Sequence, residues 1–190
     1  MREKYQYCAF YCDENIWKLC EKLEQESAFQ DCSGYVIFIS NLQQSCAIWH
    51  QKTSESADLP VVFDYHVILL LEEEKLGWQV WDLDTRLRFP EKAVTYFRET
   101  FSPGYEVDEE LRPLFRLVSA QDYLKNYSTD RSHMLDENGD WQEPPPHWDA
   151  PYHEDNGMNL FDFINMEEGV SGKGLNGEVL ELQSMLNRFV

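Results

Sequence analysis

The sequence predicts an α+β fold in which helices pack on a mostly antiparallel sheet. Apolar, β-branched runs at 35–39 and 61–71 have the length and composition of strands. Short polar connections follow such runs, so neighbouring strands are expected to pair as antiparallel hairpins. Helical apolar periodicity occurs elsewhere along the chain. A length of 190 residues fits one domain, so we expect residues 1–190 to fold together.

The first half of the chain contains the clearest helix and a neighbouring strand. Residues 13–25 carry apolar side chains at helical spacing from Ile16 to Leu23, with acidic residues in the first turn, where the helix dipole favours them. The run at 35–39 lies between a glycine and an asparagine, which indicates a strand. Residues 46–49 are the expected hairpin partner of this strand.

The longest predicted strand, 61–71, leads into a charged turn. The turn spans about 73–75, and a second strand is expected from Trp78 to about Thr85. The connection is so short that these two strands must pair antiparallel.

The second half of the chain reads as short elements around a long loop. Little periodicity and three consecutive prolines predict a loop at about 128–157, and a loop of this length is more often functional than idle. The other expected elements are helices at 91–101, 108–113, 121–126, 159–166 and 181–189 and a strand at 114–119.

The charge balance limits the classes of partner. There are 16 basic and 35 acidic residues, a net charge of −19. Such a chain repels nucleic acid and anionic membranes, because neither releases counterions to it. The start of the chain is charged and no apolar run reaches about 18 residues, so we expect neither a signal peptide nor a membrane span and predict a cytoplasmic, also nuclear, location. An equally simple interpretation of the acidic excess is a solubilising surface.

The cysteines predict free thiols. There are five, an odd number, and the start of the chain carries no secretory signal. They form no CxxC pair, and His133, His147 and His153 lie at spacings that do not match zinc sites. We therefore expect no metal and no other cofactor.

Cys12 lies at the start of the first predicted helix. Unpaired N–H groups and the positive end of the dipole lower the pKa of a thiol there, whereas the neighbouring Asp13 and Glu14 oppose this effect. A nearby imidazolium would be needed to keep the thiolate populated at neutral pH. The alternative is a buried structural thiol, since free cysteine is among the most buried residue types.

His66 and two acids are expected to meet on one face of the predicted hairpin. Alternation along the strand places Asp64 and His66 on the same face, and Asp82 and Asp84 share a face of the next strand. A three-residue turn at 73–75 places Asp82 opposite His66, and a turn centred one residue later places Asp84 there. Cysteine at a helix start, with histidine and aspartate on adjacent strands, is the arrangement that a thiol hydrolase needs.

Several segments of the sequence resemble one family. The segment 11–20, YCDENIWKLC, is similar to the nucleophile segment of the eukaryotic protein N-terminal glutamine amidohydrolases. FDYHV at 63–67 resembles the histidine strand of that family, and WDLDT at 81–85 its aspartate strand. Further similar segments follow in the same order at 122–126, 128–134, 143–146 and 158–164. The resemblance covers nearly the whole chain from Cys8 onward.

The resemblance implies a role for each residue of the site. Cys12 is then the nucleophile, His66 the base and Asp82, rather than Asp84, the acid that orients the imidazole. It also implies a papain- or transglutaminase-like core and a single catalytic domain that deamidates N-terminal glutamine to glutamate through a thioester. The implied partners are proteins or peptides with a free N-terminal glutamine, and the product feeds the Arg/N-degron pathway. We expect the chain to act as a monomer.

Restricting the reaction to the first residue requires a site for a free α-ammonium. Carboxylates would supply it, and the candidates are Asp64, Asp13, Glu14 and Asp130. Ser132 and His133 in the long loop are expected to line the pocket, and His133 is an alternative catalytic base. Two other functions fit parts of the pattern: a cysteine peptidase or transglutaminase with the same triad, and an acidic adaptor in which Cys12 is merely buried.

Overall fold

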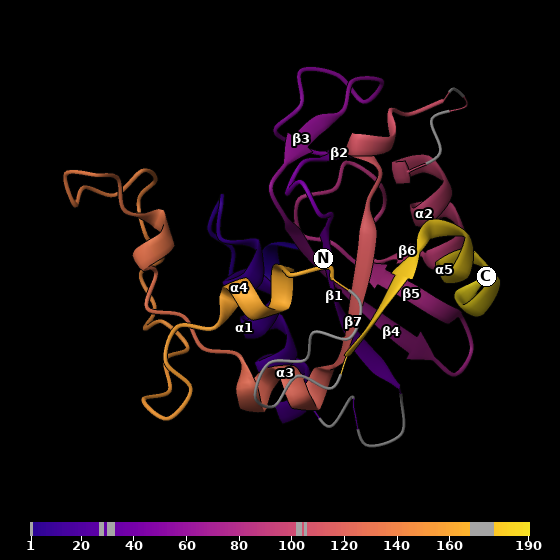
Figure 1. The fold of residues 1–190 in the computed structure, drawn as a ribbon. Coiled ribbons are helices and arrows are strands. Elements are labelled where there is room, and N and C mark those ends of the chain that lie inside the picture. The colour runs from indigo at the N-terminus through magenta and orange to yellow at the C-terminus, as the bar shows by residue number, and fades with distance from the viewer. Residues whose placement is uncertain (1, 27–28, 30–32, 102–103, 105, 168–176) are drawn as a thin grey trace.

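The computed structural model describes residues 2–26, 29, 33–101, 104, 106–167 and 177–190. A six-stranded sheet lies at the centre of the fold (Figure 1). The strand order is β6-β5-β4-β1-β7-β8, and each neighbouring pair is antiparallel. The strands are β1 (Gly34–Ser40), β4 (His66–Glu73), β5 (Gly77–Trp81), β6 (Glu91–Lys92), β7 (Leu114–Ser119) and β8 (Gly177–Glu181). The predicted α+β class with a mostly antiparallel sheet is confirmed.

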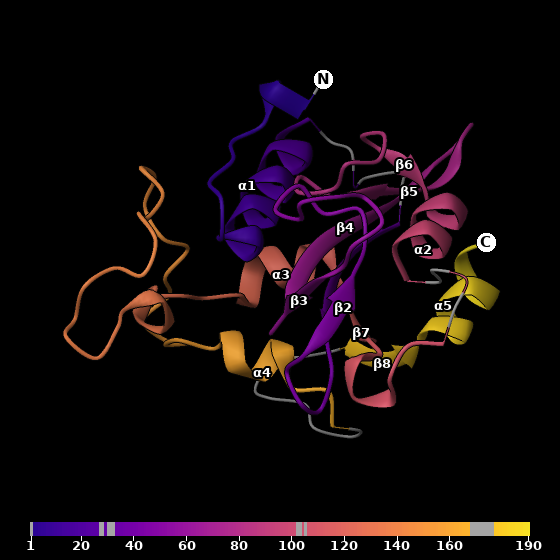
Figure 2. The ribbon, with the colours of Figure 1, turned by 90° about the horizontal axis from the view of Figure 1, so that it is seen from above.

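Helices cover both faces of this sheet. Helices α1 (Cys12–Gln25), α3 (Ala120–Asn126) and α4 (Leu160–Ile164) lie on one face. Helices α2 (Ala93–Phe101) and α5 (Leu182–Phe189) lie on the other, as Figures 1 and 2 show. A strand buried on both faces needs apolar residues at every position rather than at alternate ones. The continuous run Val36-Ile37-Phe38-Ile39 in β1 meets this need, since its side chains enter the two cores alternately.

Two predictions about the strands were wrong. Residues 46–49 do not pair with β1, because β4 and β7 occupy both of its edges. Instead β2 (Cys46–Ile48) pairs with β3 (Val61–Phe63) in a separate two-stranded sheet. The predicted strand 61–71 is therefore two strands, because the chain bends at Asp64 as it passes from one sheet to the other. The Ser40 hydroxyl donates to the Asp64 carbonyl at 2.6 Å and holds this bend.

The remaining elements agree with the predictions except at four places. Residues 91–92, expected within the helix 91–101, form strand β6, and α2 begins at Ala93. The second strand of the hairpin ends at Trp81 rather than at about Thr85, and 108–113 contains only a short 3-10 helix, Glu109–Leu111. Strand β8 was not predicted, because an edge strand with two apolar residues gives little periodicity. Short 3-10 helices also occur at Arg2–Lys4 and Ser132–Met134. The resemblance to a papain- or transglutaminase-like core stays a prediction.

The long segment 128–157 forms an arm that leaves the sheet and its helices, visible in both views (Figures 1 and 2). The longest regular element within it is the 3-10 helix Ser132–Met134, and an isolated bridge joins Leu135 to Trp141. None of the helices in the described part of the chain has the length and apolarity required to span a membrane.

Candidate active site

The candidate site lies where α1, β4 and β5 meet at one end of the sheet. Cys12 is the first residue of α1, His66 the first residue of β4, and Asp82 the first residue after β5. Helix α1 packs against β4, and the backbone of Val67, the second residue of β4, forms a hydrogen bond with the Cys12 thiol. Cys12 is half-buried. The first intrahelical hydrogen bond runs from the Asn15 N–H to the Tyr11 carbonyl, so helix geometry leaves the N–H groups before Asn15 without an intrahelical acceptor.

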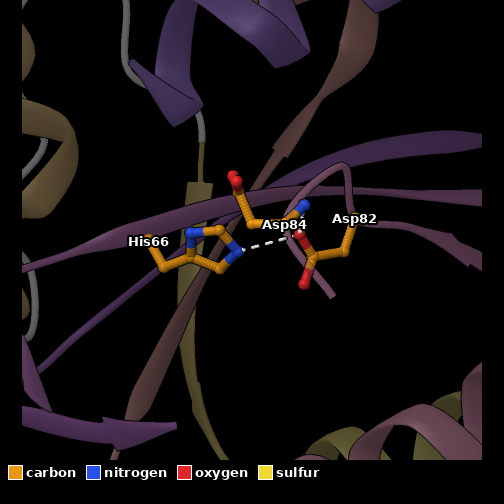
Figure 3. A group of neighbouring side chains, drawn as sticks. All are labelled: His66, Asp82 and Asp84. Atoms are coloured by element: carbon orange, nitrogen blue, oxygen red, sulfur yellow. Dashed lines mark hydrogen bonds and ion pairs between the residues drawn. The ribbon is translucent and has the colours of Figure 1, made fainter. Parts of the chain in front are cut away.

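His66 and Asp82 form a buried hydrogen-bonded pair (Figure 3). The His66 Nε2 lies 3.1 Å from the Asp82 Oδ1, and the side chains are 1% and 0% exposed. Asp82 accepts three further hydrogen bonds: at Oδ1 from the Asp84 N–H (2.8 Å), and at Oδ2 from the Tyr96 hydroxyl (2.8 Å) and the Gln51 amide (3.3 Å). A carboxylate with four donors is fixed in position and in charge.

The strand register does not by itself select this acid. The β4–β5 ladder pairs Leu69 with Trp81, and its continuation would bring Asp84 opposite His66. The ladder ends at Trp81, however, and the chain turns so that the Asp84 N–H points at the Asp82 carboxylate. The turn brings Asp82 to the imidazole. Figure 3 shows the Asp84 side chain pointing away from Asp82, yet a carboxylate oxygen of Asp84 lies within 4.8 Å of a ring nitrogen of His66.

The pair shifts the pKa values of both members. Burial alone would lower the pKa of His66, but the negative charge of Asp82 and its hydrogen bond outweigh burial and hold this pKa above its usual value. Burial alone would raise the pKa of Asp82. The charge and hydrogen bond of His66, together with the other donors, outweigh burial and hold this pKa below its usual value. The pair therefore stabilises an imidazolium whenever His66 accepts a proton.

The second ring nitrogen of His66 is buried and has no hydrogen-bond partner among the described residues. It is therefore available to exchange a proton with a group entering the site. The Cys12 thiol has a pKa well above its usual value, first because of burial and then because of the charges of Asp13 and Asp84, although a hydrogen bond from the Val67 backbone opposes these effects. The thiol thus needs a base. His66 is a buried imidazole at the beginning of β4, the strand against which α1 packs.

Asp13 is buried among tyrosines. Its side chain accepts hydrogen bonds from the Tyr127 and Tyr65 hydroxyls, the latter at 3.4 Å, and its backbone carbonyl accepts one from the Tyr123 hydroxyl at 2.9 Å. Burial raises the pKa of Asp13, and the Tyr127 hydrogen bond opposes this. Asp13 is 1% exposed. Its backbone carbonyl joins α1 to α3, and its carboxylate joins α1 to Tyr127 after α3 and to Tyr65 before β4, so the carboxylate does not face solvent.

Glu14 also belongs to a closed network. Arg131 binds it in a bidentate ion pair, Nε to Oε1 at 2.6 Å and Nη2 to Oε2 at 2.7 Å, and the Trp148 indole donates to Oε2 at 2.9 Å. Its side chain is 1% exposed. The oxygens of Glu14 are thus taken, and the network fastens the arm to the helix that carries Cys12.

The remaining predicted substrate-binding residues are more exposed. Asp64 is exposed, accepts a hydrogen bond from the Tyr65 N–H, and acts by its charge on Cys12. Asp130 and Ser132 are exposed in the arm, where the Ser132 N–H donates to Asp130 at 2.9 Å and, with the Ser132 hydroxyl, lowers its pKa. His133 is partly buried, with Nε2 3.5 Å from the Tyr65 hydroxyl. None of these reaches the Asp82 carboxylate, so His66 is the imidazole held by it.

Four side chains of the site were not predicted from the sequence. Asn15 holds the segment before the nucleophile, accepting from the Cys8 N–H at 2.8 Å and donating to the Cys8 carbonyl at 2.7 Å. Gln51 and Tyr96 bind Asp82, and the Tyr7 hydroxyl donates to Asp84 at 2.5 Å. Asn15 lies in α1, Tyr96 in α2, and Tyr7 and Gln51 in separate segments outside the helices and named strands, so no spacing in the sequence predicts these contacts. Only the position of Asn15 within the first turns of α1 could have drawn attention to it.

His66, Asp82 and Asp84 lie close enough together to be considered as metal ligands. The oxygens of Asp82 already accept four hydrogen bonds, so a cation there would have to break the His66–Asp82 pair. A cavity of about 1050 Å³ lies elsewhere, lined in part by Asn41, Glu110 and Gln183. None of the predicted site residues lines this cavity, so the candidate active site is the group of residues around the start of α1.

A thiol at a helix start beside a buried imidazole–carboxylate pair is typical of hydrolases with a cysteine nucleophile. The family model described as N-terminal glutamine amidase matches residues 7–189. The chain is 39% identical to the protein N-terminal glutamine amidohydrolase of Homo sapiens over 183 residues, 96% of this chain and 87% of that relative. Its counterpart in Bos taurus is 39% identical (96% and 86% covered), and that in Arabidopsis thaliana 35% (93% and 82%). The chain belongs to the N-terminal glutamine amidase family.

Proposed function

We propose that this chain hydrolyses the side-chain carboxamide of an N-terminal glutamine in proteins or peptides, giving N-terminal glutamate and ammonia. Family membership and the printed names of its relatives support the reaction. The observation that supports the residues is the His66 imidazole, held at one nitrogen by Asp82 and buried without a partner at the other. Only a base in this state can take a proton from Cys12 and return it to a leaving group.

The proposed first half-reaction forms a thioester. The unpartnered nitrogen of His66 accepts the Cys12 proton, and the sulfur attacks the glutamine δ-carbon. The resulting oxyanion accepts hydrogen bonds from backbone N–H groups at the start of α1, which have no intrahelical acceptor. The tetrahedral intermediate collapses as the imidazolium gives its proton to the nitrogen, and the carbon–nitrogen bond breaks to release ammonia. Asp82 balances the imidazolium charge throughout.

The proposed second half-reaction restores the thiol. His66 accepts a proton from water, and the hydroxide attacks the thioester carbon. Collapse of this intermediate breaks the carbon–sulfur bond, and the sulfur recovers the proton from the imidazolium. The sum of both halves is one amide and one water converted to one carboxylate and one ammonium ion, so no metal, redox partner or other cofactor is needed.

The cellular setting is part of the same proposal. We place the chain in the cytoplasm and also in the nucleus, where it acts as a monomer. Its product, a protein with an N-terminal glutamate, feeds the Arg/N-degron pathway. The substrates are proteins and peptides with a free N-terminal glutamine, and the net charge of −19 favours their cationic N-termini over nucleic acid or anionic membranes.

The test compares three peptides that are identical except at the first residue: glutamine, asparagine and acetylated glutamine. Ammonia release and a one-dalton mass gain are followed. Asparagine is one methylene shorter, which moves its amide from Cys12 by about a bond length and lowers the rate roughly 100-fold. We expect glutamine far above asparagine, and acetylated glutamine at background. Efficient deamidation of the acetylated peptide would instead favour a transglutaminase-like enzyme. If no peptide is turned over and Cys12 does not react with an alkylating reagent, the chain is an acidic adaptor.

A further inference from the structure

One carboxylate at the site has no part in the proposed covalent steps. Asp84 lies two residues after Asp82, half-buried, with an oxygen within 4.8 Å of a His66 ring nitrogen. Its side chain points away from Asp82 (Figure 3). The Tyr7 hydroxyl donates to its Oδ1 at 2.5 Å, and Tyr7 is 41% exposed, so this carboxylate lies near the surface of the site.

Asp84 lacks a cationic partner. Among the described residues, no lysine, arginine or histidine forms an ion pair with it. Lys52 is nearby, but its ammonium donates to the Leu83 carbonyl at 2.6 Å. A partly desolvated carboxylate beside another carboxylate, with no cation of its own, is a site that a bound cation would stabilise.

The other acidic side chains near Cys12 are already engaged. Asp82 accepts four hydrogen bonds, Glu14 is paired with Arg131, and Asp13 is enclosed by tyrosines. Asp64 is exposed, so water screens its charge and an ion pair there would gain little. Asp84 thus combines proximity to the reacting groups, partial burial and an unpaired charge.

We infer that Asp84 binds the α-ammonium of the N-terminal glutamine and thereby restricts the enzyme to the first residue, an assignment that rests on the proposed function. In glutamine four bonds separate the δ-carbon from the α-nitrogen, a span of about 5 Å when extended. A δ-carbon at Cys12 and an amide nitrogen at His66 therefore leave the ammonium within reach of a carboxylate beside His66. Tyr7 fixes one oxygen of Asp84 and leaves the other for the substrate.

The inference is tested with Asp84→Asn and two peptides: one begins with glutamine, and in the other hydrogen replaces the α-amino group. With the free amine, kcat/KM should fall about 10- to 150-fold, the range for losing a hydrogen bond between charged groups. The peptide without the amino group should not react more slowly, because removing a negative charge lowers the pKa of the Cys12 thiol. Equal losses for the two peptides would assign Asp84 to His66 rather than to the substrate and overturn the inference.

A second measurement needs only the glutamine peptide. The α-ammonium of a peptide has a pKa of about 8, so wild-type kcat/KM should fall as the pH rises through this value, and this alkaline limb should flatten in Asp84→Asn. Glu74→Gln, at the far end of the β4–β5 hairpin, loses the same charge and should change neither measurement. If Asp64→Asn rather than Asp84→Asn removes the preference for the free amine, the inference is wrong. Failure of the wild type to release ammonia from any glutamine peptide would refute the proposed function itself.

Discussion

The Asp82→Asn substitution tests the proposed mechanism most directly. Asparagine has nearly the same shape, and the fold can accommodate it because the Gln51 carbonyl oxygen, buried without a partner among the described residues, can accept from the new amide once Gln51 flips. The substitution removes the charge opposite His66. At 3.1 Å and an effective dielectric constant of about 20, two opposite unit charges attract each other by about 5 kcal/mol.

This energy sets the expected loss of rate. About 5 kcal/mol corresponds to nearly four orders of magnitude if all of it is lost in the transition state. The asparagine carbonyl still accepts a hydrogen bond from His66, so we expect kcat/KM to fall by about 100- to 10,000-fold. The pH profile should move too. Asp82 holds the pKa of His66 above its usual value, and without this charge burial lowers it, so the acidic limb of activity should move to lower pH.

The assay is ammonia release from a glutamine peptide between about pH 5 and pH 9, with thermal unfolding as the control for folding. Glu74→Gln loses one carboxylate at the other end of the same hairpin and should leave both the rate and the midpoint of the acidic limb unchanged. A folded Asp82→Asn variant with kcat/KM within tenfold of the wild type, or with an unmoved acidic limb, would refute a charge-balancing role for Asp82.

Three further substitutions have definite expected outcomes. Cys12→Ala should lower the rate of ammonia release by several orders of magnitude without lowering the unfolding midpoint, whereas Cys8→Ser should keep most of the activity. Near-normal turnover by Cys12→Ala would exclude the thioester. Arg131→Met leaves Glu14 buried and unpaired, so chemical denaturation should show a loss of about 3–5 kcal/mol, and a loss under 1 kcal/mol would contradict the burial of this pair. Tyr96→Phe removes one hydrogen bond to the Asp82 carboxylate and should cost about 1.5–3 kcal/mol of stability by the same measurement.

The sequence alone gave a sound prediction of the elements whose signal is local. Apolar spacing in α1 placed this helix within one residue of its observed bounds. An unbroken apolar run identified β1, and the apolar residues around Arg116 identified β7. These signals are reliable because the periodicity of side-chain burial is set by the backbone geometry of each element. The position of Cys12 at the start of a helix followed from the same reasoning.

Pairing between elements could not be predicted in this way. The segment 46–49 has the composition of a partner for β1, but β4 and β7 occupy both edges of β1, and β2 pairs with β3 instead. Which strands pair depends on the competition among all of them for the same edges, and this competition leaves no mark within any one segment.

The choice between Asp82 and Asp84 shows the same limit at the site. Alternation along two strands established that a carboxylate and an imidazole would meet, and family resemblance selected Asp82. The observed strand register, extended past Trp81, would have selected Asp84. The tertiary structure decides otherwise, because the chain turns away from the ladder there, and donors from Gln51 and Tyr96, 31 and 14 residues away in sequence, hold the Asp82 carboxylate against His66. Composition and periodicity determine which groups are available, and only long-range hydrogen bonds determine which of them are paired and which stay free to bind a substrate.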